Sequence, residues 1–188
     1  MRLTLQASTE ALLKVIADLE LPLFMDDLTP GKGNCFFAAF CQQMRRPEVG
    51  LENLYTVTSL RCLICDYALT EIEERVVTFR NEYEKIAAKP WNIFFNEMRK
   101  NGVYAEGPVP FVAAYMLNRN IIHISLTCKS NNPWYLIKGE RVGETNVAPI
   151  ILGNISNVHF QSFLPTSGFE TFLADTTTLP DQLRKLPT

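Results

Sequence analysis

The sequence predicts an α+β fold in which a layer of helices packs on one small sheet. Two observations lead to this prediction. Up to Asn118, apolar residues recur three and four positions apart, which is typical of helices. From Ile121 onward, short β-branched and aromatic runs alternate with Asn, Gly and Pro, which is typical of strands joined by turns. Helices therefore fill roughly the first two thirds of the chain, and strands fill the rest.

The elements can be placed in order along the chain. The first helix is expected over residues 8–19, with Ser8 as its N-cap, and the second runs from Cys35 to just before Pro47. Residues 52–88 contain no Gly or Pro and are expected to form two helices or one broken helix. Further helices are expected at residues 91–98 and 109–118. Strands are expected at residues 121–126, 134–137, 149–152 and 158–163.

The composition describes one globular domain. The 188 residues are 47% hydrophobic and 20% charged, enough to build a core without a disulfide or a structural metal. We expect this domain at residues 1–165 and a partly ordered C-terminal tail at residues 166–188. The formal charge of −2 provides neither a broad basic surface nor a polybasic segment. We therefore expect a monomer that binds neither nucleic acid nor a membrane.

The five cysteines indicate a reducing compartment, because their number is odd and their scatter does not resemble a disulfide framework. Cys62 and Cys65 have C-x-x-C spacing, but no second pair or nearby histidine completes a metal site, so we expect them in the core. The N-terminus lacks the unbroken apolar run of a signal peptide. These features predict an intracellular, cytoplasmic protein, of its own cell or of a host cell.

Cys35 is the best candidate nucleophile, because a glycine-rich loop at residues 30–34 delivers it to a helix N-terminus. The helix dipole and the free backbone N–H groups there favour a thiolate and can bind an oxyanion. Gly33 allows the tight turn that brings these groups close to a reacting carbonyl. The helix end contributes about 1 kcal/mol. Ionising most of an ordinary thiol at pH 7 takes about 2.7 kcal/mol, so a base is also required.

The base must be one of two histidines, because imidazole accepts and returns a proton near neutral pH. His123 lies inside an alternating apolar strand, where a structural role is the more common one. His159 begins a strand with polar neighbours. Asn157 or Gln161 could orient its imidazole, because alternate residues of a strand share a face.

Three motifs resemble those of the ovarian tumour (OTU) family of cysteine proteases. Gly-Asn-Cys-Phe-Phe at residues 33–37 is similar to that family's Asp-Gly-Asn-Cys-Leu/Phe-Phe/Tyr. Asn-Gly-Val-Tyr-Ala at residues 101–105 resembles its Gly-Thr-Trp-Gly-Gly, and His-Phe-Gln-Ser-Phe at residues 159–163 resembles its His-Tyr-Asn/Asp-Ser-Val/Leu. The motifs occur in the family order, and the resemblance covers residues 20–165. It implies a papain-type cysteine protease fold with a small, mostly antiparallel sheet packed against helices.

The resemblance also implies an activity, that of a deubiquitinase. Such an enzyme hydrolyses the isopeptide or peptide bond after the C-terminal glycine of ubiquitin, polyubiquitin or a ubiquitin-like modifier, without a metal or a cofactor. Cys35 would form the thioester, with His159 as general base and then general acid. Two short segments would contact the substrate. The expected oxyanion loop is Lys32, Gly33 and Asn34, and the expected channel for the ubiquitin tail is Tyr104, Ala105 and Glu106.

Two positions depart from the family pattern. Lys32 stands where the family usually has Asp, and we expect its backbone rather than its side chain to contribute. Gln161 stands where the family usually has Asn or Asp, and its longer, neutral side chain orients an imidazole less well than a carboxylate would. We therefore prefer Asn157 as the third catalytic residue and a bare Cys–His dyad next. Gln161 is the alternative residue for the third position.

These departures leave a second function open, a catalytically weak or inactive ubiquitin-binding pseudoenzyme or interaction module with the same fold. A third is a cysteine hydrolase or acyltransferase with an unrelated substrate. This third function would use the same cysteine and histidine, and would differ from the first only in the substrate that the cleft binds.

Overall fold

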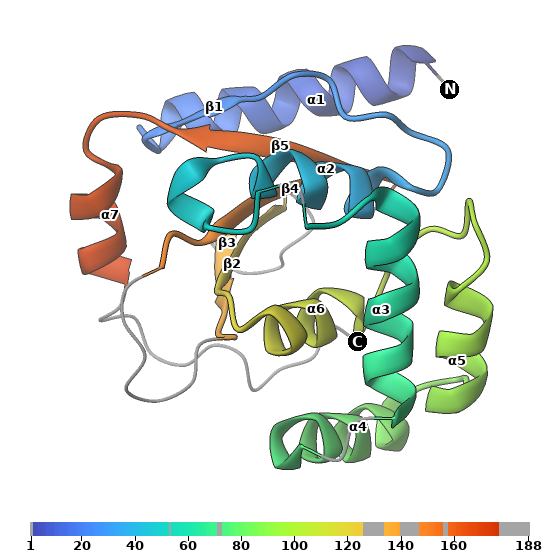
Figure 1. Ribbon diagram of the computed structural model, residues 1–188. Coiled ribbons are helices and arrows are strands. Elements are labelled where there is room, and N and C mark those ends of the chain that lie inside the picture. Colours follow the sequence, from blue (N-terminus) through green and yellow to red (C-terminus); the bar gives the residue numbers. More distant parts are fainter. Residues whose placement is uncertain are drawn as a thin grey trace.

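The computed structural model describes residues 2–52, 54–70, 73–125, 134–139, 147–155 and 158–176. Within them, a five-stranded sheet lies between two groups of helices (Figure 1). The helices are α1 (Arg2–Asp18), α2 (Cys35–Met44), α3 (Val57–Thr70), α4 (Glu74–Ile86), α5 (Trp91–Met98), α6 (Val109–Leu117) and α7 (Phe169–Thr176), with a 3-10 turn, η1, at Pro47–Val49. The strands are β1 (Leu23–Met25), β2 (Ile121–Ser125), β3 (Trp134–Ile137), β4 (Ile150–Ile155) and β5 (His159–Pro165).

The strand order of the sheet is β1-β5-β4-β2-β3. Three of its four pairings are antiparallel, whereas β2 and β4 are parallel. The predicted α+β class, with a mostly antiparallel sheet, is therefore confirmed. β5 lies between β1 and β4, and its first residue, His159, pairs with Ile155 at the end of β4.

Both faces of the sheet are covered, whereas the sequence led us to expect one helical layer. On one face Ile121, Leu152 and Phe160 pack with residues of α2, α3, α5 and α6. On the other face Ile122 and Ile151 pack with α1 and α7, and Figure 1 shows α1 and α2 on opposite sides of β5. Apolar runs such as Ile-Ile leave no polar position to face water, as is typical of strands buried on both faces. This demand for burial explains the second layer.

Two local features differ from the predictions. α1 begins at Arg2, so Ser8 lies inside the helix and is not its N-cap. β1 has no counterpart among the predicted strands, because three residues are too few to show a strand pattern. Its pairing with β5, in which Phe24 lies opposite Leu164, depends on that longer partner. The remaining predicted elements agree with the structure to within a few residues, and segment 52–88 forms two helices.

α7 belongs to the core on the α1 side of the sheet. Phe169 is buried there, and Phe172 packs edge-on against Trp134 with ring centroids 5.3 Å apart. This helix falls within the segment 166–188 that we expected to be a tail. Residues 177–188 of that segment lie outside the described residues.

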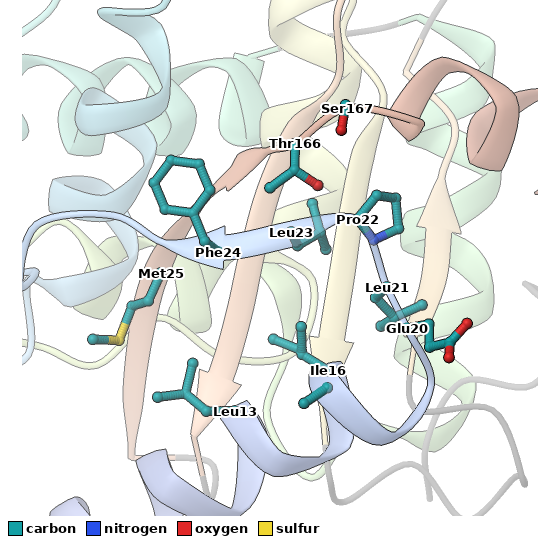
Figure 2. A pocket seen from close by; sticks show the side chains of 11 residues that line it. Leu13, Ile16, Glu20, Leu21, Pro22, Leu23, Phe24, Met25, Thr166 and Ser167 are labelled. Atoms are coloured by element: carbon teal, nitrogen blue, oxygen red, sulfur yellow. The ribbon is translucent and has the colours of Figure 1, made fainter.

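A shallow groove of about 430 Å³ lies between α1 and β1 (Figure 2). Its walls include Leu13 and Ile16 from α1 and Leu21 and Leu23 from the segment around β1. None of the predicted site residues lines this groove, so the reacting groups must be sought elsewhere. Of the helices described, none has the length and apolar character that crossing a membrane requires.

Candidate active site

Cys35 is the first residue of α2, as predicted, and only 1% of it is exposed. The phenylalanines that follow it fix the helix in place. Phe36 packs edge-on against Phe160 of β5, with ring centroids 5.1 Å apart. This contact holds the N-terminus of α2 against the beginning of β5.

Backbone N–H groups surround the sulfur of Cys35. Those of Phe160, Phe36 and Cys35 itself, together with the positive charge of Arg61, lower the pKa of the thiol. Burial has the larger, opposite effect, so the pKa of Cys35 is raised above its ordinary value. The Phe160 amide was not foreseen from the sequence, because strand β5 and helix α2 meet only in the folded chain. It places the sulfur beside the residue that directly follows His159.

His159 is also buried, with 5% of its surface exposed. Burial lowers the pKa of its imidazole, and a hydrogen bond with the side chain of Gln161 partly offsets this. Its Nε2 atom is buried and has no hydrogen-bond partner among the described residues. Burial thus favours the neutral forms of both the Cys35 thiol and the His159 imidazole.

Gln161 lies two residues along β5 from His159, and its side chain is completely buried. Its Oε1 accepts a hydrogen bond of 3.1 Å from the backbone N–H of Thr29, and its Nε2 donates one of 2.9 Å to the carbonyl of Asp27. These bonds fix the amide beside the imidazole. Asn157, the preferred third residue, lies outside the described residues, so its role stays a prediction.

The loop before Cys35 is held in an unusual backbone conformation. Lys32 and Gly33 both have positive φ angles, of 65° and 80°. A Cβ atom on Gly33 would lie 1.7 Å from the carbonyl oxygen of Gly102, so only glycine fits there. The Lys32 side chain is exposed, and no residue in the described ranges forms a hydrogen bond or ion pair with it. The positive φ angle of Lys32 is part of the turn that leads into Cys35.

The sequence analysis missed Arg61 of α3, whose side chain is 2% exposed. Its Nη2, which carries two hydrogens, lies 2.8 Å from each of three acceptors, the carbonyls of Gly33 and Val103 and Oδ1 of Asn34, so two of these bonds share a hydrogen. A signal was present in the sequence. Arg61 interrupts the apolar face of α3 formed by Leu60, Ile64, Cys65 and Ala68, and a charged residue on such a face is rarely buried without a specific partner.

Tyr104 is the predicted channel residue that lies near Cys35. Its ring stacks on that of Phe160 with centroids 5.7 Å apart, and its buried hydroxyl lies near the side chain of Asn154. Burial, and next the nearby Cys35, raise the pKa of the hydroxyl, which stays protonated. Ala105 is buried in the core, whereas Glu106 is exposed.

The other histidine and cysteines lie in structural surroundings. The Nδ1 atom of His123 contacts the hydroxyl of Tyr135, and burial lowers the pKa of His123 to about 4. Burial raises the pKa values of Cys41 and Cys65 to about 11. Cys62 is half-buried on α3, and Cys128 lies outside the described residues. Over the described ranges, no group of His, Cys, Asp and Glu side chains is arranged to hold a metal ion.

A cysteine at a helix N-terminus, beside a strand that begins with a histidine, defines a chain of the cysteine-protease class. The model of one such family, described as OTU-like cysteine protease, matches residues 30–148. This match covers more than half of the chain, which therefore belongs to the OTU family. The recognition made from the three motifs is confirmed.

Solved structures agree with this assignment. An OTU deubiquitinase from Wolbachia pipientis wMel, bound to ubiquitin, superposes with a TM-score of 0.55 at 15% identity over 77% of this chain and 96% of that one. The OTUD1 OTU domain has a TM-score of 0.54 at 16% identity, with coverages of 87% and 99%. The viral OTU domain protease from Taggert virus has a TM-score of 0.53 at 11% identity, with coverages of 77% and 81%. A comparison with curated proteins finds no match.

Proposed function

We propose that this protein is a cysteine-dependent deubiquitinase that hydrolyses the bond after the C-terminal glycine of ubiquitin or a ubiquitin-like modifier. The observation that carries the proposal is the position of Cys35, where amides of α2 and β5 converge on the sulfur beside the strand that His159 begins. Membership of the OTU family supports the reaction class. The ubiquitin bound to the Wolbachia relative supports the choice of substrate.

The reaction begins from a neutral pair. The Cys35 thiol passes its proton to the unpartnered Nε2 of His159, and the resulting thiolate attacks the carbonyl carbon of the substrate. Backbone N–H groups at the start of α2 stabilise the negative oxygen, a contribution worth about 3 kcal/mol per donor in comparable sites. The imidazolium then protonates the leaving amine. Finally, water deprotonated by His159 hydrolyses the thioester and restores the thiol.

A ubiquitin probe with a C-terminal propargyl group tests this proposal. Wild-type protein is expected to form a covalent adduct that increases its mass by one ubiquitin, and Cys35→Ala is expected to form none. Cys41→Ala is the matched control, since Cys41 is the other cysteine of α2 and its half-buried thiol has a pKa of about 11. Absence of an adduct with folded wild-type protein, or an adduct on another cysteine, would contradict the proposal.

One observation favours the alternative, a ubiquitin-binding module with weak or no catalysis. Cys35 is 1% exposed, and burial favours the neutral forms of both Cys35 and His159. Calorimetric titration of Cys35→Ala with ubiquitin separates the two functions. Binding by this variant, combined with wild-type protein that forms no probe adduct, would support the alternative.

A further inference from the structure

We propose that Arg61 is a positioning residue that joins the two loops of the active site and supplies its positive charge. The proposal rests on the proposed hydrolysis. One loop, residues 32–34, leads into Cys35, and the other, residues 101–103, leads into Tyr104. Arg61 reaches both of them from α3.

The guanidinium spans the two loops with one nitrogen. Nη2 contacts the carbonyl of Gly33 on the first loop and the carbonyl of Val103 on the second, each at 2.8 Å. Nη1 donates a further bond of 2.7 Å to the carbonyl of Met98 at the end of α5. A planar group with several fixed donors suits this task, whereas an ammonium cannot reach all of these acceptors at once.

The side chain of Asn34 also links the two loops. Its Oδ1 accepts hydrogen bonds from Arg61 at 2.8 Å and from the backbone N–H of Gly102 at 3.2 Å, while its Nδ2 donates one of 2.8 Å to Oδ1 of Asn101. Asn34 occupies the N-cap position of α2, yet its side chain makes no capping bond. Its polar atoms are used to join the loops. Between them, Gly33 and Gly102 are in backbone contact that a single Cβ would prevent.

The charge of Arg61 lacks a conventional partner. The side chain is almost fully buried, and the ion pairs found among the described residues do not include it. Its hydrogen-bond acceptors are neutral, and its carbon Cζ lies 4.1 Å from the ring centroid of Phe37. A buried charge without a counter-charge is costly. The acidic groups near it are the thiols of Cys65, Cys62 and Cys35, in that order of influence, and of these only Cys35 becomes a thiolate in the proposed reaction, where it would supply a counter-charge.

Two substitutions separate the geometry from the charge. Arg61→Lys keeps the charge but loses the planar guanidinium that contacts both loops. We therefore expect kcat for a fluorogenic ubiquitin amide to fall about tenfold. KM should change less than about twofold, because Arg61 is buried. Arg61→Gln also loses the charge. We expect it to slow the alkylation of Cys35 by iodoacetamide at pH 8 about tenfold, as for a pKa raised by about one unit. Peptide mass spectrometry distinguishes Cys35 from the other four cysteines.

Arg75→Lys is the matched control. Arg75 also donates hydrogen bonds to backbone carbonyls, those of the consecutive residues Lys138 and Gly139, and its Cζ lies 4.5 Å from the ring centroid of Tyr115. This control should leave both kcat and Cys35 alkylation within about twofold of wild type. A purely structural role for Arg61 would loosen the site, and Arg61→Gln would then speed alkylation. Unchanged or faster alkylation, or an unchanged kcat in Arg61→Lys, overturns the proposal.

Asn101→Ala covers the case in which Arg61→Gln does not fold. Asn101 is exposed, so its loss spares the core while removing one bond of the connection. We expect kcat to fall about threefold with an unchanged melting temperature, and an unchanged kcat counts against the proposal. If wild-type protein does not cleave ubiquitin, the proposed function fails. The alkylation rates then decide the role of Arg61 by the same criterion, because they require no substrate.

Discussion

At the scale of single residues, the candidate site combines a buried thiol and a buried imidazole. Burial raises the pKa of Cys35 and lowers that of His159, so it favours the neutral form of each group. The amides of Phe160 and α2 and the charge of Arg61 act in the opposite direction.

Gln161 is the described side chain that contacts His159, so its substitution should affect catalysis. We expect Gln161→Ala to lower kcat by about tenfold or more, because the imidazole loses the group that orients it. Turnover of a fluorogenic ubiquitin amide measures the change, and circular dichroism checks the fold. Asn157→Ala is the comparison. Full activity in Gln161→Ala together with a loss in Asn157→Ala would instead support Asn157 as the third residue.

His123 should make the stability of the protein depend on pH. Its pKa is about 4 in the folded chain and about 6.5 when unfolded, so the unfolded chain binds more protons between these values. The stabilisation is complete above pH 6.5 and is lost as the pH falls toward 4, by about 3 kcal/mol from this residue. Urea unfolding at pH 7.5 and pH 4.5 measures the loss. His123→Gln should show a smaller difference between the two pH values, and an equal difference would refute the assignment.

At the scale of elements, the loop that enters α2 is the most constrained segment of the site. It needs two consecutive positive φ angles, at Lys32 and Gly33, and a close approach to the loop at Gly102. Such strain is maintained only where surrounding contacts hold it. Here those contacts come from Arg61 of α3 and from Asn34.

A series of glycine substitutions tests this constraint. Gly33→Ala should destabilise the fold by more than about 2 kcal/mol and abolish activity, because its Cβ would lie 1.7 Å from a carbonyl oxygen. Gly50→Ala has a positive φ of 68° but free space around the Cβ, so it should cost about 1 kcal/mol. Gly31→Ala, with neither feature, should be nearly neutral. Equal melting temperatures for the first two variants would show that the contact with Gly102 is unimportant.

At the scale of the whole molecule, the sheet carries a core on each face. The core on the α2 side holds the candidate active site, and the core on the α1 side supports the sheet from behind. Leu12 of α1 is fully buried in this second core, close to where β4 has a glycine, Gly153, and β5 has Phe163. α1 should therefore contribute directly to the stability of the sheet.

Truncating Leu12 tests the contribution of α1. Leu12→Ala should lower the free energy of unfolding by about 2–5 kcal/mol, because it leaves a cavity against the sheet. Leu19→Ala is the matched control, since Leu19 is 48% exposed and its loss should cost less than about 0.5 kcal/mol. Urea unfolding monitored by tryptophan fluorescence measures both. Similar losses of unfolding free energy in the two variants would contradict a contribution of α1 to stability.

The sequence by itself determined the α+β class, most element positions and the location of Cys35 at a helix start. These are local properties, because spacing along the chain specifies which face of a helix or strand is apolar. The tertiary structure alone decided the second helical layer and the pairing of β1 with β5. It also decided that Arg61 reaches two loops from a third element. Each of these depends on the meeting of residues far apart in the chain, which no local pattern records.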